Sequence, residues 1–170
     1  PPISTPLGGG KFLVYQSDRG GNWEIYLLHF ASGREYNLTD HAGEDRNPAL
    51  SPDGRQIAFE SHRDGNWEIY LLQIGTGELT RLTQNLAFDG APAWSPDGAH
   101  LAFESYRDGN WEIYELELED GQLTRLTDDP AGDYAPAWSA DGERIAFTSW
   151  RDGDKEIYLM EADGSSQRNL

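Results

Sequence analysis

Residues 63–70 read RDGNWEIY, and close copies of this stretch occur three more times in the chain. The copies are RGGNWEIY at residues 19–26, RDGNWEIY at residues 107–114 and RDGDKEIY at residues 151–158. One glutamate in each copy keeps a constant spacing of 44 residues: Glu24, Glu68, Glu112 and Glu156. Four copies at a fixed period identify a repeat protein, in which each repeat is one supersecondary unit.

The second repeat shows the complete pattern. A short run, NPALS at residues 47–51, ends in the turn SPDG, where proline presets the backbone and glycine closes the turn. Three further runs follow: IAFES (57–61), WEIYLLQI (67–74) and LTRLT (79–83). The runs are apolar on both faces, which is typical of strands covered on both sides. The sequence therefore predicts an all-β propeller with four four-stranded antiparallel blades. A β-sandwich is the alternative, but it does not predict four near-identical units.

The repeat period also predicts the domain organisation. We expect an N-terminal arm or eroded strand at residues 1–10 and a propeller domain at residues 11–170. The blades are expected at approximately residues 3–46, 47–90, 91–134 and 135–170. The first blade has ISTPLGGG at residues 3–10, where later blades have NPALSPDG, APAWSPDG and APAWSADG, so its innermost strand is expected to be eroded.

Each blade must bury both faces, so four blades raise the question of ring closure. The chain closes alone as a four-bladed ring, pairs as a homodimer into an eight-bladed ring, or is part of a longer propeller. The eroded first strand and Lys155, which replaces the tryptophan of the other three repeats, favour the homodimer.

Composition limits the classes of partner. The formal net charge is −17, so nucleic acid and anionic membranes are disfavoured, and basic proteins or cations suit the chain better. The alternative interpretation of this charge is solubility. No apolar run approaches the roughly 18–20 residues of a membrane span, so no membrane insertion is expected. The absence of cysteine excludes disulfides and thiolate metal sites.

The pattern PAWSPDG, then IAFxSxRDGNWEIY, then LTRLT resembles the WD-like repeat of the TolB-type propellers and of sensor propellers attached to some bacterial kinases and peptidases. The resemblance covers residues from about 11 to 170. It implies a non-enzymatic bacterial protein that binds other proteins in the cell envelope, with a periplasmic or otherwise extracytoplasmic location.

The repeat separates residues that serve the fold from residues free to serve a partner. Arg19, Arg63, Arg107 and Arg151 occupy one repeat position, so we expect each to pair with a carboxylate of its own or a neighbouring blade. Asp45, Asp89 and Asp133 occupy another. The functional alternative for these three aspartates is an acidic ring at the channel mouth that contacts a partner.

Oxygen-bearing side chains on one loop raise the question of calcium binding. No cofactor is expected, but Asp64, Asn66 and Glu68 alternate as D-x-N-x-E on a loop, and such hard oxygen donors suit Ca²⁺. The simpler interpretation is that Asn66 closes a turn and Glu68 begins a strand.

The residue before each repeated arginine varies and is often aromatic: Asp18, His62, Tyr106 and Trp150. Phe88 and Tyr134 lie on loops expected at the same edge of the blades. Large aromatic side chains on exposed turns are typical interface anchors. We therefore expect a protein or peptide to bind His62, Tyr106, Trp150, Phe88 and Tyr134, rimmed by carboxylates. The alternative is that these side chains pack as local core.

No catalytic residue is expected. The four histidines occupy non-equivalent repeat positions, and no G-x-S-x-G, H-E-x-x-H or Walker motif is present. The favoured function is a non-enzymatic binding scaffold that docks a protein or peptide on the acidic loop-rich face and channel mouth. The alternatives are a hydrolase or metal-dependent enzyme using channel carboxylates, and a sensor or ligand-binding module of a larger protein.

Overall fold

The computed structural model describes residues 11–170, so the predicted N-terminal arm and eroded strand lie outside the described residues. Every regular element in the described part of the chain is a β-strand, as predicted. No helix long and apolar enough to cross a membrane occurs in these residues. The chain divides into two compact units, Pro1–Gln84 and Asn85–Leu170, each of which holds two sheets.

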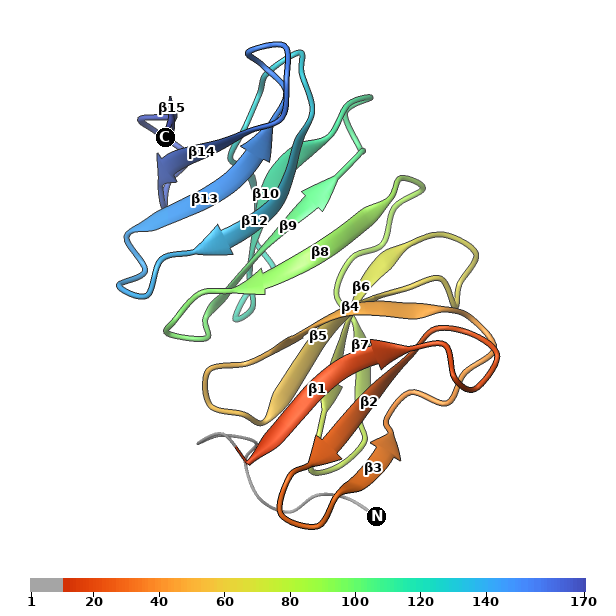
Figure 1. Ribbon diagram of the computed structural model, residues 1–170. Coiled ribbons are helices and arrows are strands. Elements are labelled where there is room, and N and C mark those ends of the chain that lie inside the picture. The colour runs from red at the N-terminus through yellow and green to blue at the C-terminus, as the bar shows by residue number, and fades with distance from the viewer. Residues whose placement is uncertain (1–10) are drawn as a thin grey trace. The chain divides into compact units, whose positions relative to one another are not determined.

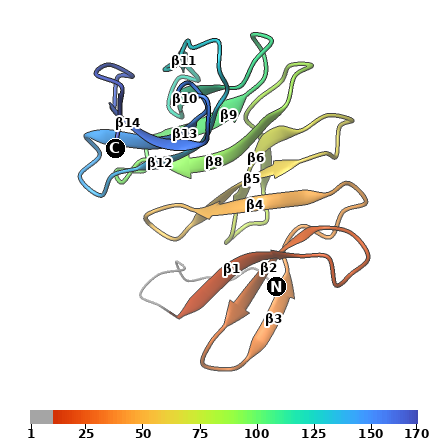
Figure 2. The same ribbon diagram turned by 45° about the horizontal axis from the view of Figure 1, so that its top comes forward.

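The first unit contains a three-stranded sheet and a four-stranded sheet, both simple antiparallel meanders (Figure 2). The three-stranded sheet consists of β1 (Phe12–Ser17), β2 (Glu24–His29) and β3 (Arg34–Asn37). The four-stranded sheet consists of β4 (Asp45–Leu50), β5 (Gln56–Ser61), β6 (Glu68–Gln73) and β7 (Leu79–Arg81). The first sheet thus has one strand fewer than predicted within the described residues.

The second unit contains two four-stranded meanders (Figure 1). One consists of β8 (Asp89–Trp94), β9 (His100–Ser105), β10 (Glu112–Glu117) and β11 (Leu123–Arg125). The other consists of β12 (Asp133–Trp138), β13 (Arg144–Ser149), β14 (Glu156–Glu161) and β15 (Arg168–Asn169). The two central strands of each sheet are the runs that the sequence pattern predicts.

The innermost strands begin two residues earlier than the apolar pattern predicts. In β4, for example, Asp45 faces Ser61 and Arg46 faces Glu60 before the register shifts at Ala49. The same shift recurs in β8 and β12, where a residue with left-handed backbone precedes a proline: Asn47, Ala91 and Ala135, each with φ of 48°. At the bulge in β12 the backbone bonds to the preceding sheet: the Ala135 N–H donates to Glu104 Oε2 at 2.8 Å.

The core of each unit lies between its two sheets. In the first unit Ile25 and Leu27 of β2 pack with Ile57 and Phe59 of β5. In the second unit Ile113 of β10 packs with residues of β13 and β14, and Leu126 closes the cluster. These are the apolar residues that recur with the period, so the repeat is set by packing between neighbouring sheets.

The turns between the first and second strands are stabilised by an aspartate that accepts a hydrogen bond from a serine. Ser95 Oγ donates to Asp97 Oδ1 at 2.5 Å, and the Ala99 N–H donates to the same oxygen at 3.0 Å. Equivalent pairs join Ser51 to Asp53 and Ser139 to Asp141. In each turn the serine hydrogen bond is the largest influence holding the pKa of the aspartate below its ordinary value of 3.8.

These turns are expected to make the fold sensitive to acid. A carboxyl whose pKa is lower in the folded state contributes stability above its unfolded pKa, and that contribution is lost as the pH falls through the folded pKa. The melting temperature of Asp97→Asn should therefore fall less than that of the unmodified chain between about pH 5 and pH 2. Ser95→Ala, which removes the donor, should flatten the same profile. Unchanged pH dependence in both variants would contradict this role of the turn.

Candidate functional site

The three repeated aspartates are buried, so they do not form an exposed acidic ring. Asp45, Asp89 and Asp133 are all 0% exposed. Each accepts a hydrogen bond from the arginine of its own sheet, as the repeat predicts: Arg63 at 3.0 Å, Arg107 at 3.0 Å and Arg151 at 2.7 Å. The expectation that these carboxylates contact a partner at the channel mouth is corrected, because burial and the ion pair engage them inside the sheet.

Each of these arginines is also held between two aromatic rings. The Arg107 guanidinium lies 5.5 Å from the ring centroid of Phe103 and 4.5 Å from that of Tyr114. Arg63 and Arg151 make the same pair of contacts in their sheets. The Arg107 Nε–H donates to Ser105 Oγ at 2.8 Å. The arginine at this repeat position therefore stabilises its own sheet and does not serve as a binding residue.

The side-chain oxygens of Asp64 and Glu68 in the D-x-N-x-E stretch already accept hydrogen bonds from other side chains. Asn66 donates its side-chain amide to Glu68 Oε1 at 2.7 Å, and Arg81 donates to the same oxygen at 2.9 Å. Asp64 accepts hydrogen bonds from Tyr70 and Arg81. Burial, together with the Asp64 contact, raises the pKa of Tyr70 to about 12, so this phenol stays a proton donor. In the described residues, no group of three or more histidine or acidic side chains is arranged to hold a metal.

We expect calcium to have no effect on stability. The guanidinium of Arg81 lies where a cation would have to approach Glu68, and like charges repel at this distance. Melting curves with excess Ca²⁺ and with a chelator should coincide. A higher melting temperature in Ca²⁺ that disappears in Asp64→Asn would contradict this expectation.

Three of the predicted anchor residues meet at one tryptophan in the second unit. Phe88, Tyr106 and Tyr134 contact the ring of Trp111, with centroids 4.9, 5.4 and 5.6 Å away. Phe88 comes from the loop before β8, Tyr106 from the β9–β10 hairpin, and Tyr134 from the start of β12. The hairpin is tied to the loop by the Tyr106 N–H, which donates to the Phe88 carbonyl at 3.0 Å. Loop and hairpin therefore share one edge of the sheet, as the sequence predicts.

This cluster remains open to solvent. Tyr106 is 45% exposed, and Leu86 on the same loop as Phe88 is 100% exposed. Burial and the nearby Glu104 raise the pKa of Tyr134, so its hydroxyl remains protonated at neutral pH. We call the set Leu86, Phe88, Tyr106, Trp111 and Tyr134 the Trp111 patch.

Carboxylates lie on the hairpin and loop that flank the patch. Asp108 follows Tyr106 on the hairpin and its side chain is 37% exposed, while Asp128 is 86% exposed on the loop after β11; both carboxylates form ion pairs with Arg125, at 3.5 and 2.7 Å. Trp150, on the β13–β14 hairpin, is 48% exposed, and its N–H donates to the Gly132 carbonyl at 3.3 Å. Trp150 thus lies on a hairpin tied to the loop that leads to Tyr134, but no ring contact joins it to Trp111 in the described structure.

His62 belongs to the first unit and has a separate environment. Its ring lies 5.3 Å from that of Trp67, and the Arg46 guanidinium lies 5.0 Å from the same tryptophan. Arg46 also lies 5.7 Å from the ring of Trp23. Here a cation occupies the repeat position that Tyr134 holds in the second unit.

Sequence reasoning missed Trp111 and Leu86. Tryptophan recurs at residues 23, 67 and 111, which suggests a role in the core. The sequence alone therefore did not indicate that three variable aromatic residues contact Trp111. A usable signal was present at the variable position that Arg46, Gly90 and Tyr134 occupy, because only the last of these is aromatic.

Repeated antiparallel meanders of one period, packed sheet on sheet, define the class of β-propeller repeat domains. The chain belongs to the TolB beta propeller domain family, whose sequence model matches residues 5–88 and 68–170.

Individual relatives agree with this assignment. The Tol-Pal system protein TolB of Francisella tularensis subsp. tularensis (strain WY96-3418) is 40% identical over 58 residues, which are 33% of this chain and 13% of that protein. The solved structure of a putative TolB from Agrobacterium tumefaciens matches with a TM-score of 0.85 and 28% identity, over 94% of this chain and 61% of that chain. TolB from Acinetobacter baumannii matches with a TM-score of 0.84 and 27% identity, over 94% of this chain and 40% of that chain. The chain therefore spans less than two thirds of each of these proteins.

Proposed function

We propose that the chain is a non-enzymatic scaffold that docks a protein or peptide on the Trp111 patch. The observation that carries this proposal is the meeting of three variable aromatic side chains at Trp111, while Tyr106 remains half exposed. Aromatic residues that keep exposed area on a rigid sheet edge are the usual anchors of protein interfaces. The family relationship supports the proposal, because the matched relatives are named as components of the Tol-Pal system.

The charge of the surroundings indicates the chemistry of the partner. Asp108 and Asp128 lie on the flanking hairpin and loop, and the whole chain carries a net charge of −17. Arg125 already pairs with both carboxylates, so a basic segment would gain attraction mainly from the net charge of the chain, together with cation–π contacts from the exposed rings. We therefore favour a partner with arginine or lysine beside an apolar or aromatic residue. The family resemblance supports a partner outside the cytoplasm.

An enzyme that uses the repeated carboxylates is supported less well. Asp45, Asp89 and Asp133 are buried, and each is held by an arginine, so a substrate does not reach them in this structure. A sensor or ligand-binding module of a larger protein remains compatible with the Trp111 patch, because docking is the same physical event in both cases.

Docking on the patch is tested by substitution. Peptides are selected from a displayed library against the whole chain, and the affinity of one selected peptide is measured by calorimetry. Tyr106→Ala should weaken binding roughly tenfold or more, as loss of an interface anchor does. Phe30→Ala, which removes an exposed aromatic residue from the β2–β3 hairpin, should leave the affinity unchanged.

Melting temperatures separate docking from a purely structural role. We expect Tyr106→Ala and Trp150→Ala to melt close to the unmodified chain, because about half of each side chain is already in water. A clear loss of stability together with unchanged peptide affinity would mean that these rings serve only as local core, and the docking proposal would fail.

We further propose that two copies of the chain pair as a homodimer into an eight-bladed ring. The support is one exposed residue on β14. Ile157 is 49% exposed, whereas its repeat equivalents Ile25, Ile69 and Ile113 are exposed by no more than 1%. The face that packs into the core of its unit at Ile25 and Ile113 is thus uncovered at Ile157.

A further inference from the structure

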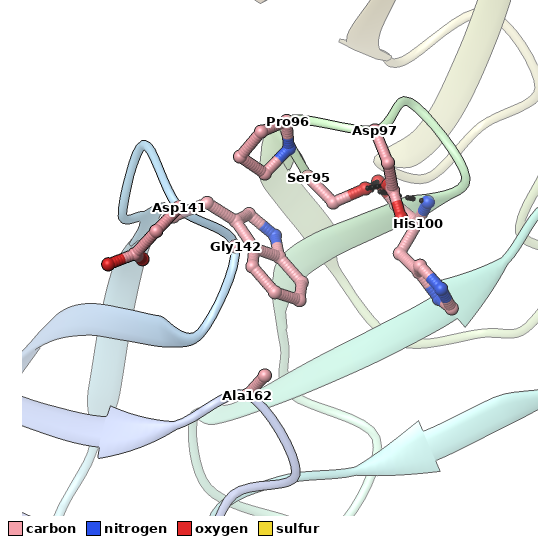
Figure 3. A pocket seen from close by; sticks show the side chains of 8 residues that line it. Ser95, Pro96, Asp97, His100, Asp141, Gly142 and Ala162 are labelled. Carbon is pink, nitrogen blue, oxygen red and sulfur yellow. Dashed lines mark hydrogen bonds between the residues drawn. The ribbon is translucent and has the colours of Figure 1, made fainter.

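A hollow of about 430 Å³ lies in the second unit, between the sheet of β8–β11 and the sheet of β12–β15. It opens beside the serine–aspartate turns, which follow the C-terminal ends of β8 and β12, whereas the Trp111 patch gathers where these strands begin. Figure 3 shows Asp97 and His100 on one side, Asp141 and Gly142 on the other, and Ala162 facing them from a third direction. The remaining lining residues are Ser95, Pro96 and Trp138. This volume suits a small ligand.

The repeat explains why the hollow exists. Ala162 occupies the position that large apolar residues hold in the other three repeats: Phe30, Ile74 and Leu118. In the first unit Ile74 belongs to the buried core cluster, and Phe12 and Leu50 pack against that cluster. Those two residues are the repeat equivalents of His100 and Trp138. The same location is therefore filled by apolar side chains in one unit, and is open and lined by polar and aromatic residues in the other.

One polar pair beside the hollow, Glu115 and His100, is specific to this repeat. Glu115 stands where the other repeats have Leu27, Leu71 and Leu159, so a carboxylate replaces a core leucine. Its Oε1 lies 3.2 Å from Nδ1 of His100. Burial raises the pKa of Glu115, and His100 opposes this rise, which is consistent with a polar pair placed inside an apolar interface. An apolar pair would pack here at lower cost, so the pair suggests selection for something other than stability.

Two further groups could recognise a ligand. Asp97 stays ionised at neutral pH, because the Ser95 hydrogen bond lowers its pKa. Trp138 contributes an indole ring, and its Nε1–H is buried without a hydrogen-bond acceptor among the described residues. Buried donors are almost always paired in native proteins, so an unpaired one in the wall of a hollow suggests a bound acceptor.

We propose that this hollow binds a small organic cation that also carries a hydrogen-bond acceptor, such as an amino alcohol or the amide of an amino acid. The cationic group would lie against the Trp138 ring and the Asp97 carboxylate, since an aromatic face and a carboxylate both attract an ammonium ion. The Trp138 Nε1–H is buried in this structure, so the acceptor would reach it only if the indole ring turned toward the hollow on binding. An anionic ligand is disfavoured by Asp97 and Asp141 in the wall and by the net charge of −17.

The test uses choline as the probe and the NMR signal of the Trp138 indole N–H as the readout. Trp138→Phe assigns that signal by its disappearance. Choline should shift it in a saturable way. The neutral carbon analogue of choline keeps the shape and the hydroxyl, and should bind at least roughly tenfold more weakly if charge matters. Tetramethylammonium lacks the acceptor and should also bind more weakly than choline.

Two substitutions localise the binding. Ala162→Ile restores the apolar side chain of the other repeats, so it should abolish the shift while keeping or raising the melting temperature. Asp97→Asn should weaken binding, whereas Asp53→Asn, in the equivalent turn of the first unit, should not. Three results would each overturn the proposal: no saturable shift with choline, equal binding of the neutral analogue, or unchanged binding in Ala162→Ile. The Trp111 patch plays no part in these measurements, so peptide docking stands or falls separately.

Discussion

Arg107→Ala is expected to lower the free energy of unfolding by about 3–5 kcal/mol, the usual cost of breaking a buried ion pair by removing one partner. The Arg107 side chain is 19% exposed and Asp89 is completely buried. One Nη of Arg107 donates to both Asp89 oxygens at 3.0 Å. Removing the guanidinium leaves a buried carboxylate that still accepts hydrogen bonds from the Ser105 hydroxyl and the Asn85 amide, and it also opens a gap between Phe103 and Tyr114.

The first sheet offers a matched control. Arg19 also lies against two aromatic rings, Tyr15 and Tyr26, but its carboxylate partner is Glu35, and both side chains of that pair are nearly half exposed to solvent. Water replaces a lost partner at such a site, so Arg19→Ala should cost far less than Arg107→Ala. Urea unfolding of both variants measures the difference.

A third variant separates charge from geometry. Arg107→Lys keeps the charge but cannot bridge both oxygens while stacking between the rings, so it should recover only part of the lost stability. Equal stability of Arg107→Ala and Arg19→Ala would show that the buried pair contributes no more than a surface pair.

The sequence predicted the fold because its period is set by packing. Residues such as Ile25 and Phe59 recur where one sheet covers the next, and their spacing is visible without coordinates. The arginine–carboxylate pairing was predictable for the same reason, because a charge repeated beside buried strands requires a partner. The pattern did not reveal that Asp45 lies inside the sheet, because a polar loop and a buried strand start look alike in sequence.

The candidate sites depend on residues whose type differs from that at the same position of the other repeats. The sequence shows these differences but does not show what each of them does. Tyr134 and Ala162 are both visible exceptions at their repeat positions. Only the packing shows that one exception adds a ring to Trp111, whereas the other removes a side chain from a core and leaves a hollow. Repetition made Trp111 look structural, and its contacts with variable residues became apparent only in three dimensions.

Ile157→Arg is expected to abolish the proposed homodimer. Ile157 on β14 is 49% exposed, and Leu13 on β1 is 47% exposed, although Ile57, Leu101 and Ile145, the repeat equivalents of Leu13, are exposed by no more than 1%. The last sheet and the first sheet thus each expose an apolar residue whose equivalents in the other repeats are buried. Burying an isoleucine or leucine side chain contributes about 1.5–3 kcal/mol, so two such contacts per dimer, related by the two-fold axis, would favour pairing.

Light scattering over a dilution series tests this assembly directly. The unmodified chain should show twice the chain mass of 19.0 kDa, whereas Ile157→Arg should show 19.0 kDa, because a desolvated arginine in an apolar interface lacks a partner. Leu123→Arg is the matched control: Leu123 is 40% exposed, but it lies on β11, the outer strand of its sheet, where its repeat equivalent Leu79 is 39% exposed as well. That variant should keep the dimer mass. A mass of 19.0 kDa for the unmodified chain at every concentration would refute the paired ring. A dimer that persists in Ile157→Arg would show that the interface does not include β14, because a neighbouring sheet cannot cover β14 with an arginine at position 157.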